Sequence, residues 1–308
     1  MRKKIILGSR GSALALAQVA LVEQALRAAH GDVEIVVKKI TTTGDRRQDP
    51  NFKVESPAGL KGLFTKEIQD ALLSGKIDAA VHSLKDVPGV TPAELTIAAV
   101  LERAPASDVL ISKTAHSFDQ LPSGARVGTS SVRRSRLLRW CRGDLQIEPL
   151  RGNVPTRLQK LRDSKNLDAI VLALAGLKRL GYVIGEGTIE FEGTTFRTDI
   201  LHELPHAIGQ GAIALECRAD DKKTRAALEK INHATTFTCI RAERELLRLL
   251  DGDCTLPVGV RTQLLGGKIL MEAIVFGEEN TEPREARDEG DATNPEALAQ
   301  QIFKQLYS

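Results

Sequence analysis

The sequence predicts an α/β protein with two lobes around a hinged cleft, followed by a small α+β domain. Three observations lead to this fold class. The chain has 308 residues, too many for one ordinary core. From residue 4 onward, short apolar runs alternate with helical patterns, as in parallel sheets. The pattern breaks at residues 103–107 and resumes, and a later run at 206–216 returns to the first lobe, which gives the two crossings of a hinged, periplasmic-binding-protein-like fold.

The composition excludes several classes of function. Lys+Arg 43 against Asp+Glu 40 leaves a net charge of +3, and aromatic residues make up only 4%, which argues against nucleic-acid binding. No apolar run reaches the length of a membrane span, and the N-terminal run is too short for a signal peptide. The four cysteines have no metal-ligand or disulfide spacing, so we expect a cytoplasmic protein without a metal.

The first lobe opens with a predicted strand at residues 4–8, a helix to about His30 with Ser12 as its N-cap, and a strand at 33–40. This β-α-β order favours a parallel sheet. Arg10 then lies at the end of a strand and beside a helix N-terminus, where an anion is well placed. An ordinary surface arginine is an equally good interpretation at this point.

Residues 41–60 contain two prolines and two glycines, and we expect a long irregular loop that acts as an active-site flap. A helix follows, opening at 61–67 and ending near Ser74. The apolar run that starts at Ala79 predicts a buried strand, and it ends in Lys85 and Asp86. A carboxylate beside a lysine at a strand's carboxyl end is a candidate acid/base group. A surface ion pair is the alternative.

The second lobe repeats one arrangement: a strand ends, hydroxyl or glycine residues follow, and a helix starts among arginines. The strand at 126–128 leads into three hydroxyl residues and two arginines, a candidate anion cradle. The strand near 147–150 and the helix start at Pro155 are flanked by further arginines. The strand at 168–172 precedes a helix at 173–180. For residues 129–134, the alternative interpretation is an N-cap followed by solvated basic residues. Residues 182–197 form a loop or a small hairpin.

The last domain has predicted helices at 222–231, 237–250 and 296–306, with a hairpin turning at Gly266-Gly267. Cys254 lies in a Gly/Asp/Pro loop rather than on an apolar face, so it is a candidate nucleophile or attachment site. The neighbouring Asp253 disfavours a thiolate, and the sequence alone does not make this cysteine reactive. We expect the other three, Cys141, Cys217 and Cys239, to be small buried hydrophobic residues.

Many of these stretches match one family. Over essentially its whole length the chain resembles the porphobilinogen deaminase (hydroxymethylbilane synthase) family. The matching stretches are Ser9-Arg10-Gly11-Ser12-Ala13-Leu14-Ala15, Lys61-Gly62-Leu63-Phe64-Thr65-Lys66-Glu67, His82-Ser83-Leu84-Lys85-Asp86-Val87-Pro88, Val127-Gly128-Thr129-Ser130-Ser131-Val132-Arg133-Arg134, Leu150-Arg151-Gly152-Asn153-Val154, Ala175-Gly176-Leu177-Lys178-Arg179-Leu180-Gly181, Gly209-Gln210-Gly211-Ala212 and the Cys254 loop.

The resemblance implies a transferase that joins four porphobilinogen molecules head to tail into hydroxymethylbilane. A dipyrromethane cofactor would be attached to Cys254 by a thioether, and Asp86 would be the catalytic carboxylate. The implied cofactor-binding residues are Lys85, Asp86, Thr129, Ser130, Ser131, Arg133, Arg134 and Arg157. The implied substrate-binding residues are Arg10, Ser12, Arg151, Arg179 and Gln210, with Lys61 and Phe64 on the flap.

The same resemblance implies a monomer that passes its product to a cyclising enzyme and binds neither nucleic acid nor membrane. We assign residues 1–102 with 200–220 to lobe 1, 103–199 to lobe 2 and 221–308 to the C-terminal domain. The main alternative is a non-catalytic two-lobed protein that binds small anions, or the effector domain of a regulator. That alternative gives no task to Asp86, Cys254 or the last domain.

Overall fold

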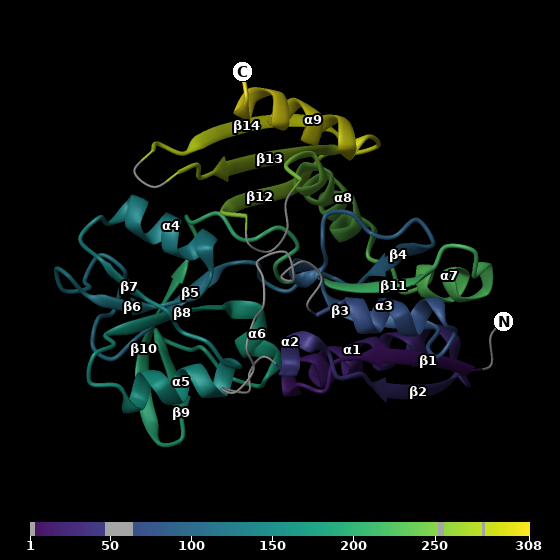
Figure 1. Ribbon diagram of the computed structural model, residues 1–308, viewed down its shortest axis with the longest axis horizontal. Coiled ribbons are helices and arrows are strands. Elements are labelled where there is room, and N and C mark those ends of the chain that lie inside the picture. The colour runs from purple at the N-terminus through teal and green to yellow at the C-terminus, as the bar shows by residue number, and fades with distance from the viewer. Residues whose placement is uncertain (1–3, 47–63, 252–255, 279–280) are drawn as a thin grey trace.

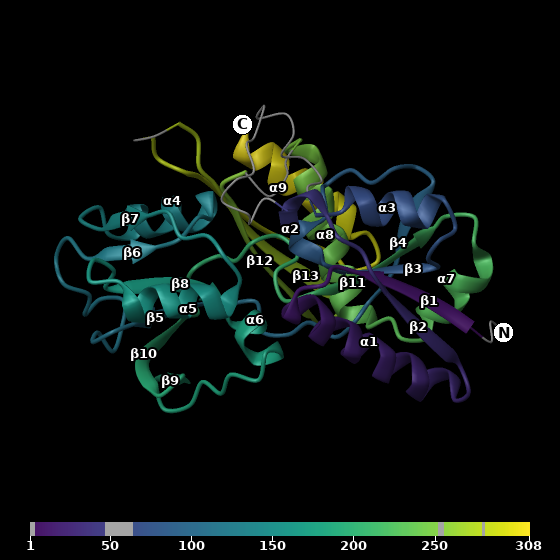
Figure 2. The ribbon, with the colours of Figure 1, turned by 60° about the horizontal axis from the view of Figure 1, so that its bottom comes forward.

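The computed structural model describes residues 4–46, 64–251, 256–278 and 281–308. Two α/β lobes lie side by side, and the C-terminal domain lies across them (Figure 1). The turned view in Figure 2 shows the two lobes as separate bodies with α6 and α1 at their border. The predicted fold class, two α/β lobes with a small α+β domain, is confirmed.

Lobe 1 begins as predicted, with β1 (Lys4–Ser9), α1 (Ala13–His30) and β2 (Glu34–Lys39) in this order along the chain. The two strands pair in parallel. The Ser12 hydroxyl accepts a hydrogen bond from the Ala15 N–H at 3.3 Å, which caps α1. The remaining elements of this lobe are α2 (Thr43–Arg46), α3 (Lys66–Leu73), β3 (Ala79–Ser83), the 3₁₀ turn η2 (Leu84–Asp86), β4 (Leu95–Val100), β11 (Ile213–Arg218) and α7 (Lys222–Glu229).

Three details of lobe 1 differ from the sequence prediction. Helix α7 was assigned to the C-terminal domain, but its residues Ala227 and Leu228 pack into the core of lobe 1. The short helix α2 lies within the stretch expected to be irregular, and Asp45 on it accepts hydrogen bonds from the Thr42 N–H and hydroxyl. The helix predicted to open at 61–67 starts at Lys66, after a turn at Phe64 and Thr65. Hydrogen bonds from a side chain to nearby backbone groups stabilise such short elements. The elements are too short to give a hydrophobic period in the sequence.

The sheet of lobe 1 has the strand order β2-β1-β3-β11-β4. Strand β11 follows all the strands of lobe 2 in the sequence, yet it pairs antiparallel with β3 and β4 of lobe 1. The expected return of the chain to the first sheet is therefore confirmed. Five of its six residues are buried, so this late strand forms part of the core of the lobe.

Lobe 2 has one mixed sheet, ordered β7-β6-β8-β5-β10-β9. The stretch 182–197, left open as a loop or a hairpin, contains the antiparallel pair β9–β10, and β10 continues to pair with β5. The elements are β5 (Asp108–Ser112), β6 (Arg126–Gly128), α4 (Val132–Cys141), β7 (Gln146–Glu148), α5 (Val154–Asp163), β8 (Ala169–Ala173), α6 (Leu174–Arg179), β9 (Thr188–Phe191) and β10 (Thr194–Leu201).

The C-terminal domain packs α8 (Ala234–Leu249) and α9 (Pro295–Leu306) on an antiparallel sheet of β12 (Val258–Leu265), β13 (Lys268–Val275) and β14 (Arg284–Asp291). Gly266 and Gly267 both have positive φ, as the predicted two-residue hairpin requires. Strand β14 was not predicted. Its sequence is largely charged, and of its residues only Ala286 is buried, so it lacks the apolar alternation that marks a strand.

The C-terminal domain contacts both lobes and the crossings between them. Leu137 of α4 packs with Ile274 and Phe276, while Arg244 of α8 donates to the Pro88 carbonyl of lobe 1 at 3.0 Å. At the first crossing, Arg103 forms a two-pronged ion pair with the buried Glu243 of α8. In the described part of the chain, no helix is long and apolar enough to cross a membrane.

Candidate active site

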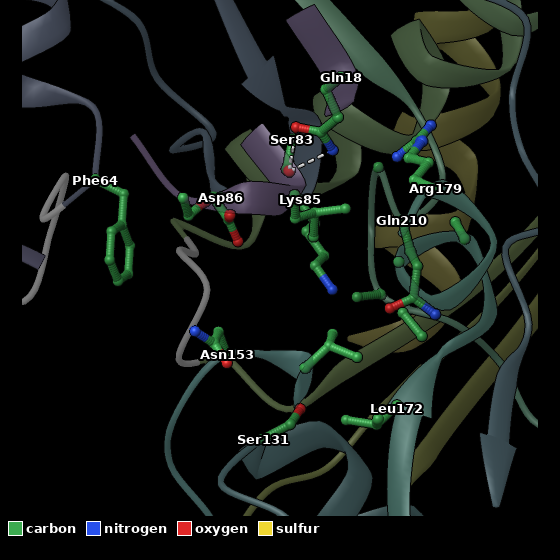
Figure 3. Close-up of a pocket in the computed structure, with 18 of the residues that line it drawn as sticks. Gln18, Phe64, Ser83, Lys85, Asp86, Ser131, Asn153, Leu172, Arg179 and Gln210 are labelled. Carbon is green, nitrogen blue, oxygen red and sulfur yellow. Dashed lines mark hydrogen bonds between the residues drawn. The ribbon is translucent and has the colours of Figure 1, made fainter. Parts of the chain in front are cut away.

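A cavity of about 660 Å³ lies between the lobes, and most of the residues implied by the resemblance line it. Asp86 and Lys85 lie on the lobe 1 side, with Ser131 and Asn153 of lobe 2 facing them (Figure 3). The implied site residues that line the cavity are Arg10, Ser12, Phe64, Lys85, Asp86, Ser130, Ser131, Arg133, Arg134, Arg157, Arg179 and Gln210.

Asp86 and Lys85 reach the cavity because β3 ends in the 3₁₀ turn η2. Leu84 is buried at this turn, and its N–H donates to the Ala212 carbonyl of the second crossing, which fixes the exit of the strand. Burial, and to a lesser extent the charge of Arg134, lower the pKa of Lys85 to about 8, although Asp86 and Asp108 act in the opposite sense. Lys85 is thus a desolvated cation that a bound anion would stabilise.

A polar pair lies beside this turn. Gln18 of α1 and Ser83 of β3 are joined at 2.8 Å between the amide nitrogen and the hydroxyl, and both side chains line the cavity (Figure 3). Gln18 is buried among Ala15, Val19 and Val22 on the apolar face of α1. A glutamine within an apolar stripe is a sequence signal for a buried polar contact, and the sequence analysis missed it.

Arg133 and Arg134 of α4 share one carboxylate. Asp108 Oδ2 accepts from Arg133 Nη2 at 2.5 Å, and Asp108 Oδ1 accepts from Arg134 Nη2 at 2.7 Å. The two arginine side chains are 4% and 7% exposed. Burial would raise the pKa of Asp108, but the two guanidinium groups outweigh it and hold that pKa well below its usual range. These arginines are therefore buried and ordered.

Further arginines come from the other helix starts of lobe 2. Asn153 caps α5 through its side-chain oxygen, and Pro155 stands in the first turn, as predicted. Arg157 Nε donates to the Gly152 carbonyl, and Arg179 Nη2 donates to the Gly211 carbonyl of the second crossing. Burial lowers the pKa of both arginines to about 10, so they are desolvated cations at the cavity wall.

Arg10 at the end of β1 is held on two sides. Its Nε and Nη2 donate to Asp45 Oδ1 at 3.0 and 2.6 Å, and its guanidinium lies 4.1 Å from the centre of the Phe64 ring. Burial raises the pKa of Asp45, but its hydrogen bonds with Arg10 and Thr42 outweigh this and lower it. This pair is about one-fifth exposed, in contrast to the buried cradle of α4.

Four implied residues do not join this group. Thr129 is buried and accepts from the Ser131 N–H, so it shapes the turn behind the cavity wall. Arg151 is exposed and is not among the lining residues. Lys61 and Cys254 lie outside the residues that the structure describes, while Leu256, two positions after Cys254 in the sequence, lines the cavity.

One prediction about the other cysteines was wrong. Cys217 and Cys239 are buried, as expected, but Cys141 is exposed. It is the last residue of α4, and the apolar face that buries Leu137 and Leu138 does not extend to it. Asp45 and Asp108 are functional candidates that the sequence analysis missed. A signal existed for Asp108, a carboxylate that opens the apolar strand Val109–Ile111 directly after a crossing.

The fold and the cavity define a class of protein: a hinged two-lobed α/β protein whose cleft combines buried cations for a polyanionic ligand with a carboxylate at a strand end. Two family models match the chain. "Porphobilinogen deaminase, dipyromethane cofactor binding domain" matches residues 5–226, and "Porphobilinogen deaminase, C-terminal domain" matches residues 237–308. The chain belongs to the porphobilinogen deaminase family, and it is a transferase of tetrapyrrole biosynthesis.

The relatives are similar over nearly the whole chain. Porphobilinogen deaminase of Desulforudis audaxviator is 44% identical over 306 residues, covering 99% of this chain and 95% of the relative. That of Shouchella clausii is 46% identical over 277 residues, covering 89% and 84%. A solved substrate binding domain of a putative amino acid ABC transporter from Streptococcus pneumoniae has a TM-score of 0.44 at 13% identity, covering 80% of this chain and 98% of that one.

Proposed function

We propose that this chain deaminates four porphobilinogen molecules and joins them head to tail into hydroxymethylbilane, on a dipyrromethane cofactor attached to Cys254. The observation that carries the proposal is that Asp86 lines a cavity whose other lining residues include desolvated cations. A volume of about 660 Å³ is in the range of small-molecule sites. In this proposal lobe 1 supplies Asp86, lobe 2 the cradle, and the C-terminal domain Cys254.

The residues present fit a cofactor with several carboxylates. The Nε atoms of Arg133, Arg134 and Arg179 are buried and have no hydrogen-bond partner among the described residues. Such donors are stabilised by an anion within reach. Lys85, Ser130, Ser131, Arg133, Arg134 and Arg157 would hold the acetate and propionate groups. When bound, the cofactor supplies the pyrrole carbon to which the first substrate is joined.

The chain's own residues would do the rest. Arg10, Ser12, Arg179 and Gln210 would bind the incoming porphobilinogen, with Phe64 over Arg10. Asp86 would hold a proton at the amino group that leaves as ammonia and stabilise the positive charge that develops on the pyrrole nitrogen. Arginines neutralise the side-chain carboxylates so that this cation forms in an otherwise balanced site. Water would then release the chain of four rings from the cofactor as hydroxymethylbilane, supplying the hydroxyl group, and this product would pass to a cyclising enzyme.

The test is intact-protein mass spectrometry of the wild type and of Cys254→Ala. We expect a mass excess of one dipyrrole unit in the wild type and the bare mass in the variant. A bare wild type that gains no mass with porphobilinogen would contradict the proposal and favour a non-catalytic anion-binding protein. A Cys254→Ala chain that still carries the unit would place the attachment elsewhere. Cys217→Ala is the matched control, because that thiol is buried in lobe 1.

A further inference from the structure

Asp108 is the group on which the cradle arginines rest. It is the first residue of β5, directly after the first crossing. Its Oδ1 accepts from Gln210 Nε2 at 2.8 Å as well as from Arg134, and its Oδ2 accepts from Arg133. Gln210 belongs to the second crossing and also donates to the Ala106 carbonyl at 2.6 Å. One buried carboxylate thus joins α4 to both crossings between the lobes.

Each guanidinium has a second fixed point. Arg133 Nη1 donates to the Pro205 carbonyl at 2.7 Å, and Arg134 Nη1 donates to the Val171 carbonyl at 3.0 Å. A planar guanidinium that is bound through two nitrogens has one orientation. The Nε atoms stay without a partner among the described residues. The two forks are therefore oriented by the protein before any ligand arrives.

The charges do not balance inside this group. Asp108 carries one negative charge against the two positive charges of Arg133 and Arg134, and Lys85 lies close enough for its pKa to respond to Asp108 and Arg134. Buried excess charge is unfavourable unless a counter-ion is supplied. The site therefore favours an anionic ligand, while Asp108 limits the repulsion between the two arginines.

We infer that Asp108 is a positioning residue for cofactor capture: it holds Arg133 and Arg134 in the orientation that receives the carboxylates of the cofactor. This inference rests on the proposed function. Because Asp108 and Gln210 belong to the two crossings, the cradle is tied to the pivot between the lobes. If the angle between the lobes changed, Arg133 and Arg134 would then keep their positions relative to the two crossings.

The test measures loading of cofactor-free chains made in cells that cannot synthesise porphobilinogen. Wild type, Asp108→Asn and Asp108→Glu are incubated with porphobilinogen, and the gain of intact mass is followed in time. We expect Asp108→Asn to load at least tenfold more slowly. Asp108→Glu keeps the charge but moves the carboxylate, and it should load at an intermediate rate.

Positioning and simple charge neutralisation give opposite results here. If Asp108 only neutralised charge, Asp108→Asn would make the cradle more positive and would load as fast as the wild type or faster, which would overturn the inference. Asp168→Asn is the control, since Asp168 accepts from the Arg126 N–H in the same lobe and away from the cavity. It should lower thermal stability and load normally.

Circular dichroism shows whether each variant is folded. If Asp108→Asn does not fold, Asp108→Glu decides, and loading at the wild-type rate would overturn the inference. If the wild type itself does not load, the proposed function fails, and that failure is distinct from a loading wild type beside a normally loading Asp108→Asn.

Discussion

Arg10 and the Arg133–Arg134 pair are both bound by aspartates, but in opposite surroundings. The Arg10–Asp45 pair is about one-fifth exposed, and Asp45 belongs to the first residues of the stretch 41–60 that we expect to form the flap. The cradle pair and Asp108 are almost fully buried at the crossings. A partly exposed ion pair contributes little and exchanges partners easily, whereas breaking a buried one is strongly unfavourable. In the proposed function, the exposed pair would contact each incoming substrate, and the buried pair would hold the one cofactor.

Asp86→Asn is the largest effect we expect, and it separates chemistry from anchoring. The amide keeps the size of the side chain but cannot take a proton or balance a cation. Turnover should fall about 10²–10⁴-fold, with the melting temperature within a degree or two of the wild type. Steady-state assays with porphobilinogen and a thermal melt measure both quantities. Near-normal turnover would remove Asp86 from the proposed role.

Asp45→Asn tests whether the Arg10 pair is exchangeable. In the proposed function Asp45 would compete with a substrate carboxylate for the guanidinium of Arg10, and a pair of this exposure is worth up to about 1 kcal/mol. We expect KM for porphobilinogen to fall by up to about fivefold, with little change in kcat. Glu67→Gln is a control on the same side of the cavity, because Glu67 accepts from Thr43 of α2 rather than from Arg10. A raised KM in Asp45→Asn would instead make Asp45 a residue that orients Arg10.

Lys85 gives a pH test of the buried side, and its effect is on stability rather than on turnover. Its pKa in the folded chain is about 8, below its ordinary value of 10.5. Between these pH values the unfolded chain binds a proton that the folded chain lacks, so stability rises with pH across this window. We expect this rise in the cofactor-free Cys254→Ala chain by denaturant unfolding, and its loss when Lys85→Met is added. Equal pH profiles for the two chains would exclude a desolvated Lys85.

The sequence was sufficient for features with local causes. The β-α-β opening, the Ser12 cap, Pro155 in the first turn of α5 and the glycines of the last hairpin follow from periodicity and backbone preference, and all are present. Arg133 and Arg134 were found for the same reason, since they follow a strand end and a hydroxyl cap.

The sequence was insufficient where the cause is a distant partner. Asp108 and Arg133 are 25 residues apart, and Arg10 and Asp45 are 35 apart, so no local pattern marks either pair. Arg151 follows a strand end as Arg133 does, yet it is exposed and does not line the cavity, because the turn at Gly152 separates it from Asn153 and Arg157. Strand β14 has charged residues at most positions and becomes a strand through pairing with β13.

The position of β11 has a consequence for synthesis. Lobe 2 is uninterrupted in the sequence from β5 to β10, and its sheet is complete once residue 201 has left the ribosome. Lobe 1 starts first but needs Ile213–Arg218 between β3 and β4. Until β11 is made, the edges of β3 and β4 that pair with it in the folded chain stay unpaired. Unpaired edges of this kind favour association with other chains. The lobe whose synthesis begins first is therefore the one that must wait for protection by a nascent-chain chaperone or by its own last strand.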